Sequence, residues 1–233
     1  MKARDRLIVA LDVPEEALAM VLVDALAGQV GMFKVGSQLF TAAGPDVVRR
    51  IVGRGEHVFL DLKFHDIPNT VAGAVAGAAR LGVTLMTVHA LGGKAMLEAA
   101  VGALPAMGTR LLAITVLTSQ DEAGLRETGV GRELKEQVRG LARLARAAGV
   151  DGVVASPHEV ALLRETCGPG VLIVTPGIRP AGTRAGDQAR AATPAAALGA
   201  GADYLVVGRP ITEADDPAAA AGAILREMDQ TLG

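Results

Sequence analysis

A strand pattern followed by a helix pattern recurs eight times along the chain, and this repetition constrains the fold more than any other feature. In each repeat a short β-branched run ends in a polar residue, and an alanine-rich amphipathic stretch follows, in several cases closed by glycine. The apolar runs are continuous rather than alternating, which is typical of parallel strands buried on both faces. We predict strands at 7–12, 32–36, 57–63, 85–89, 111–117, 152–156, 172–175 and 204–208.

Amphipathic stretches after these strands predict the helices. They lie at 15–27, 45–54, 69–81, 94–104, 131–148, 157–166, 194–199 and 217–230. Eight strand–helix units in 233 residues predict a (β/α)8 barrel, and we expect residues 1–233 to form one domain. The competing architecture is a doubly wound open sheet. It lacks its dinucleotide fingerprint, because no Gly-x-Gly-x-x-Gly sequence follows the first predicted strand.

Composition excludes several classes of function. The formal net charge is -2 and aromatic residues make up 2% of the chain, which argues against a protein that binds nucleic acid through phosphates or base stacking. Cys167 is the one cysteine, so neither an internal disulfide nor a cysteine metal cluster can form. No apolar run is long enough to cross a membrane, and the run before Asp12 is too short for a signal peptide. We expect a cytoplasmic protein without nucleic-acid or membrane partners.

The segment VFLDLKFHDIPNT at residues 58–70 carries charged residues on a predicted strand. Asp61 and Lys63 lie two positions apart and therefore face the same way, and Asp66 follows them. Ionised groups on an apolar strand are costly unless they pair or take part in chemistry. A lysine between carboxylates stays protonated, because opposite charge favours its charged form. The pattern indicates a proton donor held beside negative charge, as a reaction through a carbanion requires.

Further polar residues fall at the carboxyl ends of predicted strands, where (β/α)8 barrels carry their catalytic residues. Asp12 ends the first strand, Lys34 lies on the second and His89 ends the fourth. A structural salt bridge would explain any one pair, but it is a poor explanation of the whole alternating array. We expect His89 to orient another group rather than to bind a metal. The lysines beside Asp12 and Asp61 also compensate the charge that a divalent cation would need.

A glycine- and arginine-rich loop, TPGIRPAGTRAGDQAR, occupies residues 175–190 after the seventh predicted strand. Long loops at this place often act as lids over a ligand, and arginine with glycine-rich backbone suits a phosphate. Gly208 and Arg209 follow the eighth strand, at the usual phosphate position of such barrels. We predict a phosphate clamp from these two segments. The plainer interpretation of the loop is a solvated surface segment.

Together these residues resemble the orotidine 5'-phosphate decarboxylase family. Residues 59–70 are similar to its Asp-x-Lys-x-x-Asp-Ile-x-x-Thr signature, with no position missing. Similar blocks occur in the family's order over essentially the whole chain, at residues 11–12, 33–36, 117–119, 175–180, 186–188 and 207–210. The segment 120–131 matches least.

The resemblance implies a homodimeric (β/α)8 barrel that converts orotidine 5'-phosphate to uridine 5'-phosphate and CO2 in pyrimidine biosynthesis. Such a carboxy-lyase uses no metal or organic cofactor. By resemblance Lys63 protonates the carbanion at pyrimidine C6 and is flanked by Asp61 and Asp66. The implied substrate contacts are Asp12 and Lys34 to the ribose, Thr118 and Gln188 to the pyrimidine region, Arg179, Gly208 and Arg209 to the phosphate, and Ile67, with Asp66 and Thr70 coming from the other subunit.

Two other functions fit parts of the pattern. A Mg²⁺-dependent sugar-phosphate decarboxylase or aldolase on a related barrel would share the charged residues of the signature. Lys34 and the lid at residues 179–188 argue against it. A catalytically silent protein that binds a phosphate ligand would not need Lys63 as a buried proton donor.

Overall fold

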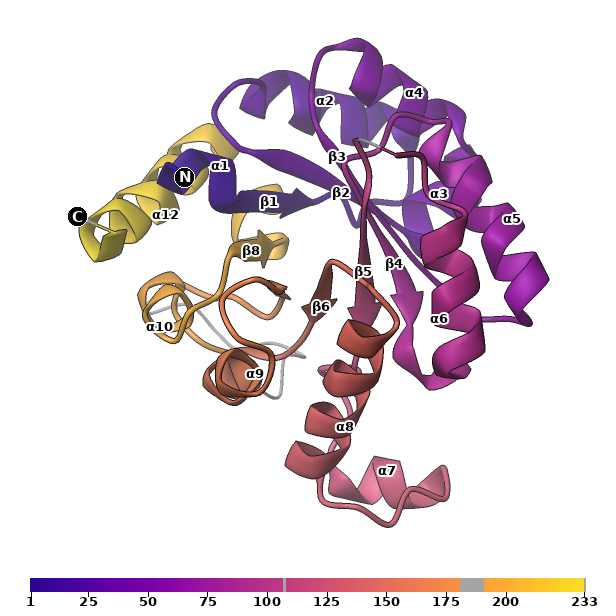
Figure 1. Cartoon of the computed structure of the whole chain (residues 1–233). Helices are drawn as coiled ribbons and strands as arrows, with labels where there is room; N and C mark the ends of the chain where they lie inside the picture. The colour runs from indigo at the N-terminus through magenta and orange to yellow at the C-terminus, as the bar shows by residue number, and fades with distance from the viewer. Residues whose placement is uncertain (107, 181–190, 233) are drawn as a thin grey trace.

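Parallel strands close into a barrel in the computed structural model, which describes residues 1–106, 108–180 and 191–232 (Figure 1). Each strand pairs with its neighbour in the sequence, and the last pairs with the first. The strands are β1 Leu7–Ala10, β2 Met32–Gly36, β3 Val58–Phe64, β4 Leu85–His89, β5 Arg110–Ile114, β6 Gly152–Val154, β7 Leu172–Thr175 and β8 Tyr204–Val207. The predicted (β/α)8 barrel is confirmed.

Helices follow the strands and cover the outside of the barrel (Figure 1). The α-helices are α1 Ala3–Arg6, α2 Glu16–Leu26, α3 Ser37–Ala43, α4 Asp46–Gly53, α5 Pro68–Ala79, α6 Gly93–Gly102, α7 Glu122–Glu127, α8 Leu134–Ala147, α9 Val160–Cys167, α10 Pro194–Gly199, α11 Arg209–Thr212 and α12 Pro217–Leu232. Two 3-10 turns are η1 Ala90–Gly92 and η2 Pro157–Glu159. Among these helices, none combines the length and the apolar character that a membrane span requires.

Two buried apolar clusters hold the barrel together. The larger cluster joins the outer faces of the strands to the helices. The smaller cluster fills the interior with alternate strand residues, which are Ile8, Ala10, Met32, Phe59, Leu85, Leu112, Ile114, Val154, Val174 and Val206. Because these side chains fill the barrel, a ligand can reach the strands only at their ends. The polar residues at the carboxyl ends therefore form the accessible face.

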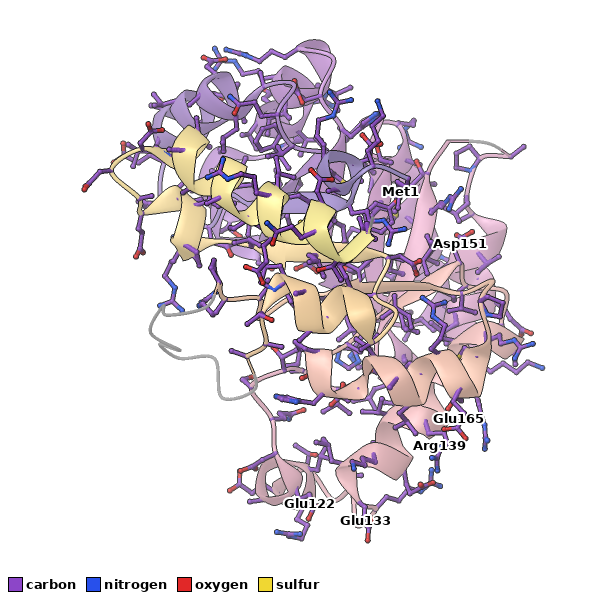
Figure 2. All side chains as sticks on the ribbon, turned by 90° about the vertical axis from the view of Figure 1, so that its left-hand side faces the viewer. Met1, Glu122, Glu133, Arg139, Asp151 and Glu165 are labelled. Carbon is purple, nitrogen blue, oxygen red and sulfur yellow. The ribbon has the colours of Figure 1, made fainter. Side chains whose placement is uncertain are left out.

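Several boundaries differ from those predicted. The strand expected to reach residue 117 ends at Ile114, because its partners His89 and Val154 are the last residues of β4 and β6. The helix expected from residue 131 begins at Leu134 and is preceded by α7. Figure 2 shows Glu122 of α7 and Glu133 at the start of α8 close together at one end of the molecule. The sequence did not predict α1, α3, α7 and α11, because such short helices display too little of the helical period.

Candidate active site

Four charged side chains form a connected array at the carboxyl ends of β1, β2 and β3. Lys34 Nζ lies 2.8 Å from Asp12 Oδ1 and 3.8 Å from Asp61 Oδ2. Lys63 Nζ lies 2.8 Å from the same oxygen of Asp61. Strand register brings them together, because Lys34 pairs with Ala10 across to β1 and Asp61 pairs with the last residue of β2. The acid–base alternation expected from the sequence is present in space.

The middle of this array is shielded from water. Lys34 and Asp61 are each 8% exposed, so their charges depend on one another rather than on solvent. Gly36 provides the space for this pairing. A Cβ added there would lie 2.8 Å from Lys34 Nζ and 3.2 Å from Asp12 Oδ1. The glycine that ends β2 therefore allows the lysine and aspartate to meet.

The backbone at Lys63 departs from strand geometry. Its φ of 52° is in the left-handed region, and among the described residues no other non-glycine residue has a positive φ. The pairing of β3 with β4 shifts register between Leu60 and Phe64, which encloses Lys63. Such a conformation costs about 1–3 kcal/mol and persists only where the surroundings enforce it. The strain coincides with the residue that the sequence analysis identified as the proton donor.

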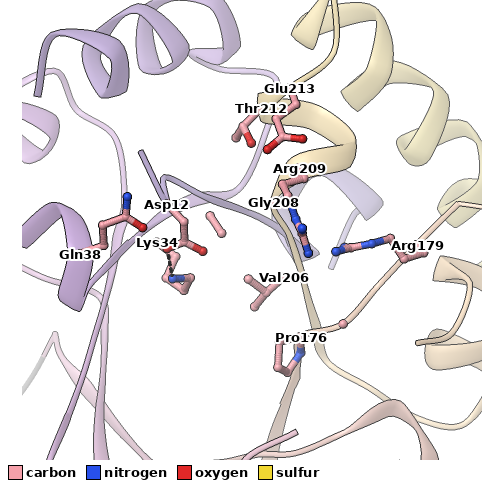
Figure 3. Close-up of a pocket in the computed structure, with 12 residues that line it drawn as sticks. Asp12, Lys34, Gln38, Pro176, Arg179, Val206, Gly208, Arg209, Thr212 and Glu213 are labelled. Carbon is pink, nitrogen blue, oxygen red and sulfur yellow. Dashed lines mark hydrogen bonds and ion pairs between the residues drawn. The ribbon is translucent and has the colours of Figure 1, made fainter. Parts of the chain in front are cut away.

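Two adjoining pockets, which share three lining residues, form a cleft of two lobes over the array, and Figure 3 shows the residues that line the first lobe. The first lobe, of about 330 Å³, extends to Arg179, Gly208 and Arg209. The second lobe, of about 230 Å³, contains Asp61, Lys63, Ile114, Val116, Leu117, Thr118 and Val154. Both lobes are lined by Asp12, Lys34 and Pro176, so they lie next to each other over the array. An elongated ligand could therefore contact both the lysines and the arginines.

Arg179 and Arg209 converge at one end of the cleft, and Figure 3 shows both guanidinium groups pointing into it. Burial lowers the pKa of Arg179, and the neighbouring charge of Arg209 lowers it further, although Glu213 acts in the opposite direction. A guanidinium group whose charge is disfavoured by burial and by a second cation marks a site that an anion would stabilise. This end of the cleft therefore suits a phosphate group.

Three predicted site residues lie away from the cleft. Asp66, Ile67 and Thr70 are exposed, and the Asp66 carboxylate accepts a hydrogen bond of 2.6 Å from the Ile67 backbone N–H. Asp66 and Thr70 line a separate cavity of about 310 Å³, which Lys63 also borders. Gln188 lies outside the described residues. Within the described chain, the cleft therefore holds the remaining predicted residues but not these.

The sequence analysis missed several residues around the site. Gln38, Thr212 and Glu213 line the first lobe, and Gln38 and Thr212 belong to the short helices α3 and α11. Thr87 touches Asp61 and Lys63 from within β4. A threonine in an apolar strand gives no signal of its own, because β-branched residues are common there.

Two imidazole rings stack next to the array. The ring centroids of His65 and His89 lie 5.3 Å apart with an interplanar angle of 19°. The Leu91 backbone N–H donates to His89 Nδ1 over 3.3 Å. Burial, followed by the charges of His65 and Lys63, lowers the pKa of His89 to about 4. His89 is therefore neutral at pH 7, which keeps its Nδ1 available as an acceptor.

The lowered pKa of His89 predicts a pH dependence of stability. In the unfolded chain the imidazole takes up a proton below about 6.5, whereas in the folded chain it does so only near 4. The free energy of unfolding should therefore decrease as the pH falls between these values, by about 1–2 kcal/mol after allowance for solvent screening of a partly exposed group. Denaturant unfolding at pH 7.5 and 4.5 should show a smaller decrease for His89→Asn. The exposed His158→Asn variant is the matched control and should behave like the wild type; equal slopes for all three would contradict the prediction.

Comparison with known proteins gives consistent matches. The family model described as "Orotidine 5'-phosphate decarboxylase / HUMPS family" matches residues 5–224. The orotidine 5'-phosphate decarboxylase of Moorella thermoacetica is 57% identical, with 98% of this chain and 94% of that protein covered. That of Halorhodospira halophila is 58% identical, with coverages of 96% and 95%. The crystal structure of orotidine 5'-phosphate decarboxylase from Lactobacillus acidophilus has a TM-score of 0.84 and 43% identity, with 96% of this chain and 98% of that chain covered.

Proposed function

The chain belongs to the orotidine 5'-phosphate decarboxylase family and decarboxylates orotidine 5'-phosphate to uridine 5'-phosphate in pyrimidine biosynthesis; we propose that the charged array and the two-lobed cleft carry out this reaction. The observation that carries the proposal is the position of Lys63. Its ammonium group lies 2.8 Å from the Asp61 carboxylate and lines one lobe of a cleft whose other lobe ends in two arginines. The proposed proton donor and anion site thus lie in adjoining lobes of the cleft.

The three parts of the substrate correspond to three parts of the cleft. The phosphate binds between Arg179 and Arg209 beside Gly208, where two cations converge. The ribose lies over Asp12 and Lys34, which line both lobes and offer hydrogen bonds to hydroxyl groups. The pyrimidine enters the second lobe, whose lining includes the proton donor and Thr118. On the family resemblance, Gln188, which lies outside the described residues, contacts the pyrimidine region.

The reaction breaks the bond between C6 and the carboxylate carbon. CO2 leaves without the bonding electrons, which remain on C6, and Lys63 Nζ then donates a proton to C6 and regains one from water. The Asp61 carboxylate forms an ion pair with the Lys63 ammonium group and disfavours the carboxylate of the bound substrate. The ammonium group stabilises the developing carbanion more than the ground state. Enzymes lower barriers by up to about 20 kcal/mol or more, and a reaction of this kind needs several preorganised charges to do so.

Fixed charges also account for a reaction without a metal or organic cofactor. Asp12 and Asp61 are each within ion-pair distance of a lysine, so the array already carries compensating positive charge. In the proposed mechanism the ammonium group of Lys63 takes the place of an electron-accepting cofactor. A Mg²⁺-dependent enzyme of the related barrel group would instead need carboxylates free to bind the cation.

The functional unit in this proposal is a homodimer with shared active sites. The support is the placement of Asp66, Ile67 and Thr70, which are exposed and lie outside their own chain's cleft. In the dimer Asp66 and Thr70 would enter the partner's site beside its Lys63. Residues 1–233 act as one cytoplasmic domain in this proposal, with orotidine 5'-phosphate as the small-molecule partner and without nucleic-acid or membrane partners.

The direct test is the absorbance change when orotidine 5'-phosphate is mixed with protein treated with EDTA. Conversion to uridine 5'-phosphate at undiminished rate is the expected result, and a requirement for added Mg²⁺ would favour the related barrel enzymes. Lys63→Ala should abolish turnover while circular dichroism shows a folded protein, because the substitution removes the proposed donor of the C6 proton. Binding of the substrate without conversion by the wild type would indicate a silent binding protein.

The phosphate clamp predicts a specific kinetic change. Arg209→Ala should raise the Michaelis constant about 10–100-fold, because a charge-assisted contact with the phosphate is lost. Arg49→Ala is the matched control, since Arg49 is an exposed arginine on α4 that pairs with Asp46. The Michaelis constants of both variants, measured by steady-state kinetics, test this prediction. An unchanged Michaelis constant for Arg209→Ala would remove Arg209 from the clamp.

Shared sites predict that two inactive variants restore activity together. Lys63→Ala and Asp66→Asn homodimers should each be inactive, but a mixed dimer would contain one site in which both residues are intact. With complete subunit exchange, the mixture should recover about a quarter of wild-type activity. Native mass spectrometry measures the fraction of mixed dimers. Mixed dimers without activity would show that each site is built from one chain.

A further inference from the structure

We propose that Thr87 is a positioning residue for the proton donor, a role that builds on the proposed function. Thr87 does not line the cleft and would not touch the substrate. It is fully buried within β4 and acts through the two residues that it contacts. Its hydroxyl group joins the side chain of Asp61 to the backbone of Lys63.

The hydroxyl group of Thr87 makes two hydrogen bonds. Thr87 Oγ1 donates to Asp61 Oδ1 over 3.0 Å, and it accepts from the Lys63 backbone N–H over 2.9 Å. A hydroxyl group has one proton to donate, and here that proton is used on the carboxylate. One oxygen atom thereby fixes both partners relative to β4.

The first bond orients the carboxylate of Asp61. With Oδ1 held by Thr87, the other oxygen, Oδ2, lies 2.8 Å from Lys63 Nζ and 3.8 Å from Lys34 Nζ. Rotation of the carboxylate would break the hydrogen bond to Thr87 and move Oδ2 away from the lysines. The threonine therefore determines which oxygen of the carboxylate contacts the proposed proton donor.

The second bond supports the irregular backbone of Lys63. Between Leu60 and Phe64 the ladder advances four residues along β3 but only two along β4, from Met86 to Val88. The Lys63 peptide lies within this mismatch, with φ in the left-handed region. Its N–H finds an acceptor in the Thr87 side chain instead of a strand carbonyl. This contact helps to hold the strained residue that carries the reacting ammonium group.

Packing alone does not require this hydroxyl group. Leu85 lies two residues earlier on β4, on the same face of the strand as Thr87, and belongs to the apolar cluster inside the barrel. Valine has nearly the shape of threonine but carries a methyl group in place of the hydroxyl group. Valine at position 87 would fill the same space, but it would leave Asp61 Oδ1 and the Lys63 N–H without this partner. The Thr87→Val substitution therefore separates positioning from packing.

The experiment compares Thr87→Val and Thr87→Ser with Thr115→Val. The control residue Thr115 is also fully buried, but its hydroxyl group donates to the Val154 backbone carbonyl rather than to a residue of the array. Thr87→Val should lower kcat about 100-fold and change KM less than about threefold, because misplacement of a reacting group affects the chemical step more than binding. Thr87→Ser keeps the hydroxyl group and should stay within about threefold of the wild type, as should Thr115→Val.

Three results would overturn the proposal: wild-type kcat in Thr87→Val, a loss in Thr87→Ser as large as that in Thr87→Val, or an equal loss in Thr115→Val. If Thr87→Val does not fold, amide hydrogen exchange at Lys63 of the wild type provides the test. Strong protection is expected, and rapid exchange would exclude the bond to Thr87. This measurement does not depend on turnover, so a wild type inactive on orotidine 5'-phosphate would refute the proposed function separately.

Discussion

The carboxylate of Asp61 is the centre on which the arrangement of the active face depends. It is buried, and a buried carboxylate is stable only with charged or hydrogen-bonding partners. Lys34, Lys63 and Thr87 provide them from β2, β3 and β4. All three partners contact the same carboxylate, so the position of Lys63 is linked to the alignment of β2, β3 and β4.

The barrel makes this arrangement possible by separating two tasks. Apolar side chains fill the interior, and the polar groups are confined to the carboxyl ends of the strands. The filled interior holds the strand ends rigid, which allows a strained residue such as Lys63 to persist. Local irregularity in β3 is tolerated because the neighbouring strands keep their register.

In the proposed function, binding and chemistry occupy different lobes of the cleft. Arg179 and Arg209 converge where a phosphate would bind, while Lys63 lies in the other lobe. In the proposed reaction, contacts with the remote phosphate can contribute to lowering the chemical barrier, because they hold the pyrimidine against the array. Asp12 and Lys34 line both lobes and connect the two ends.

Features that depend on local pattern could be predicted from the amino-acid sequence alone. Strand and helix periods predicted the barrel, and the two-residue spacing of Asp61 and Lys63, together with strand ends at Asp12 and Lys34, predicted the array. Other features become evident only in the folded chain. The contacts of Thr87, the left-handed backbone of Lys63 and the location of Asp66 outside the cleft follow from how separate strands align. The physical reason is that register and side-chain direction are set by packing between segments distant in the sequence, which no local period records.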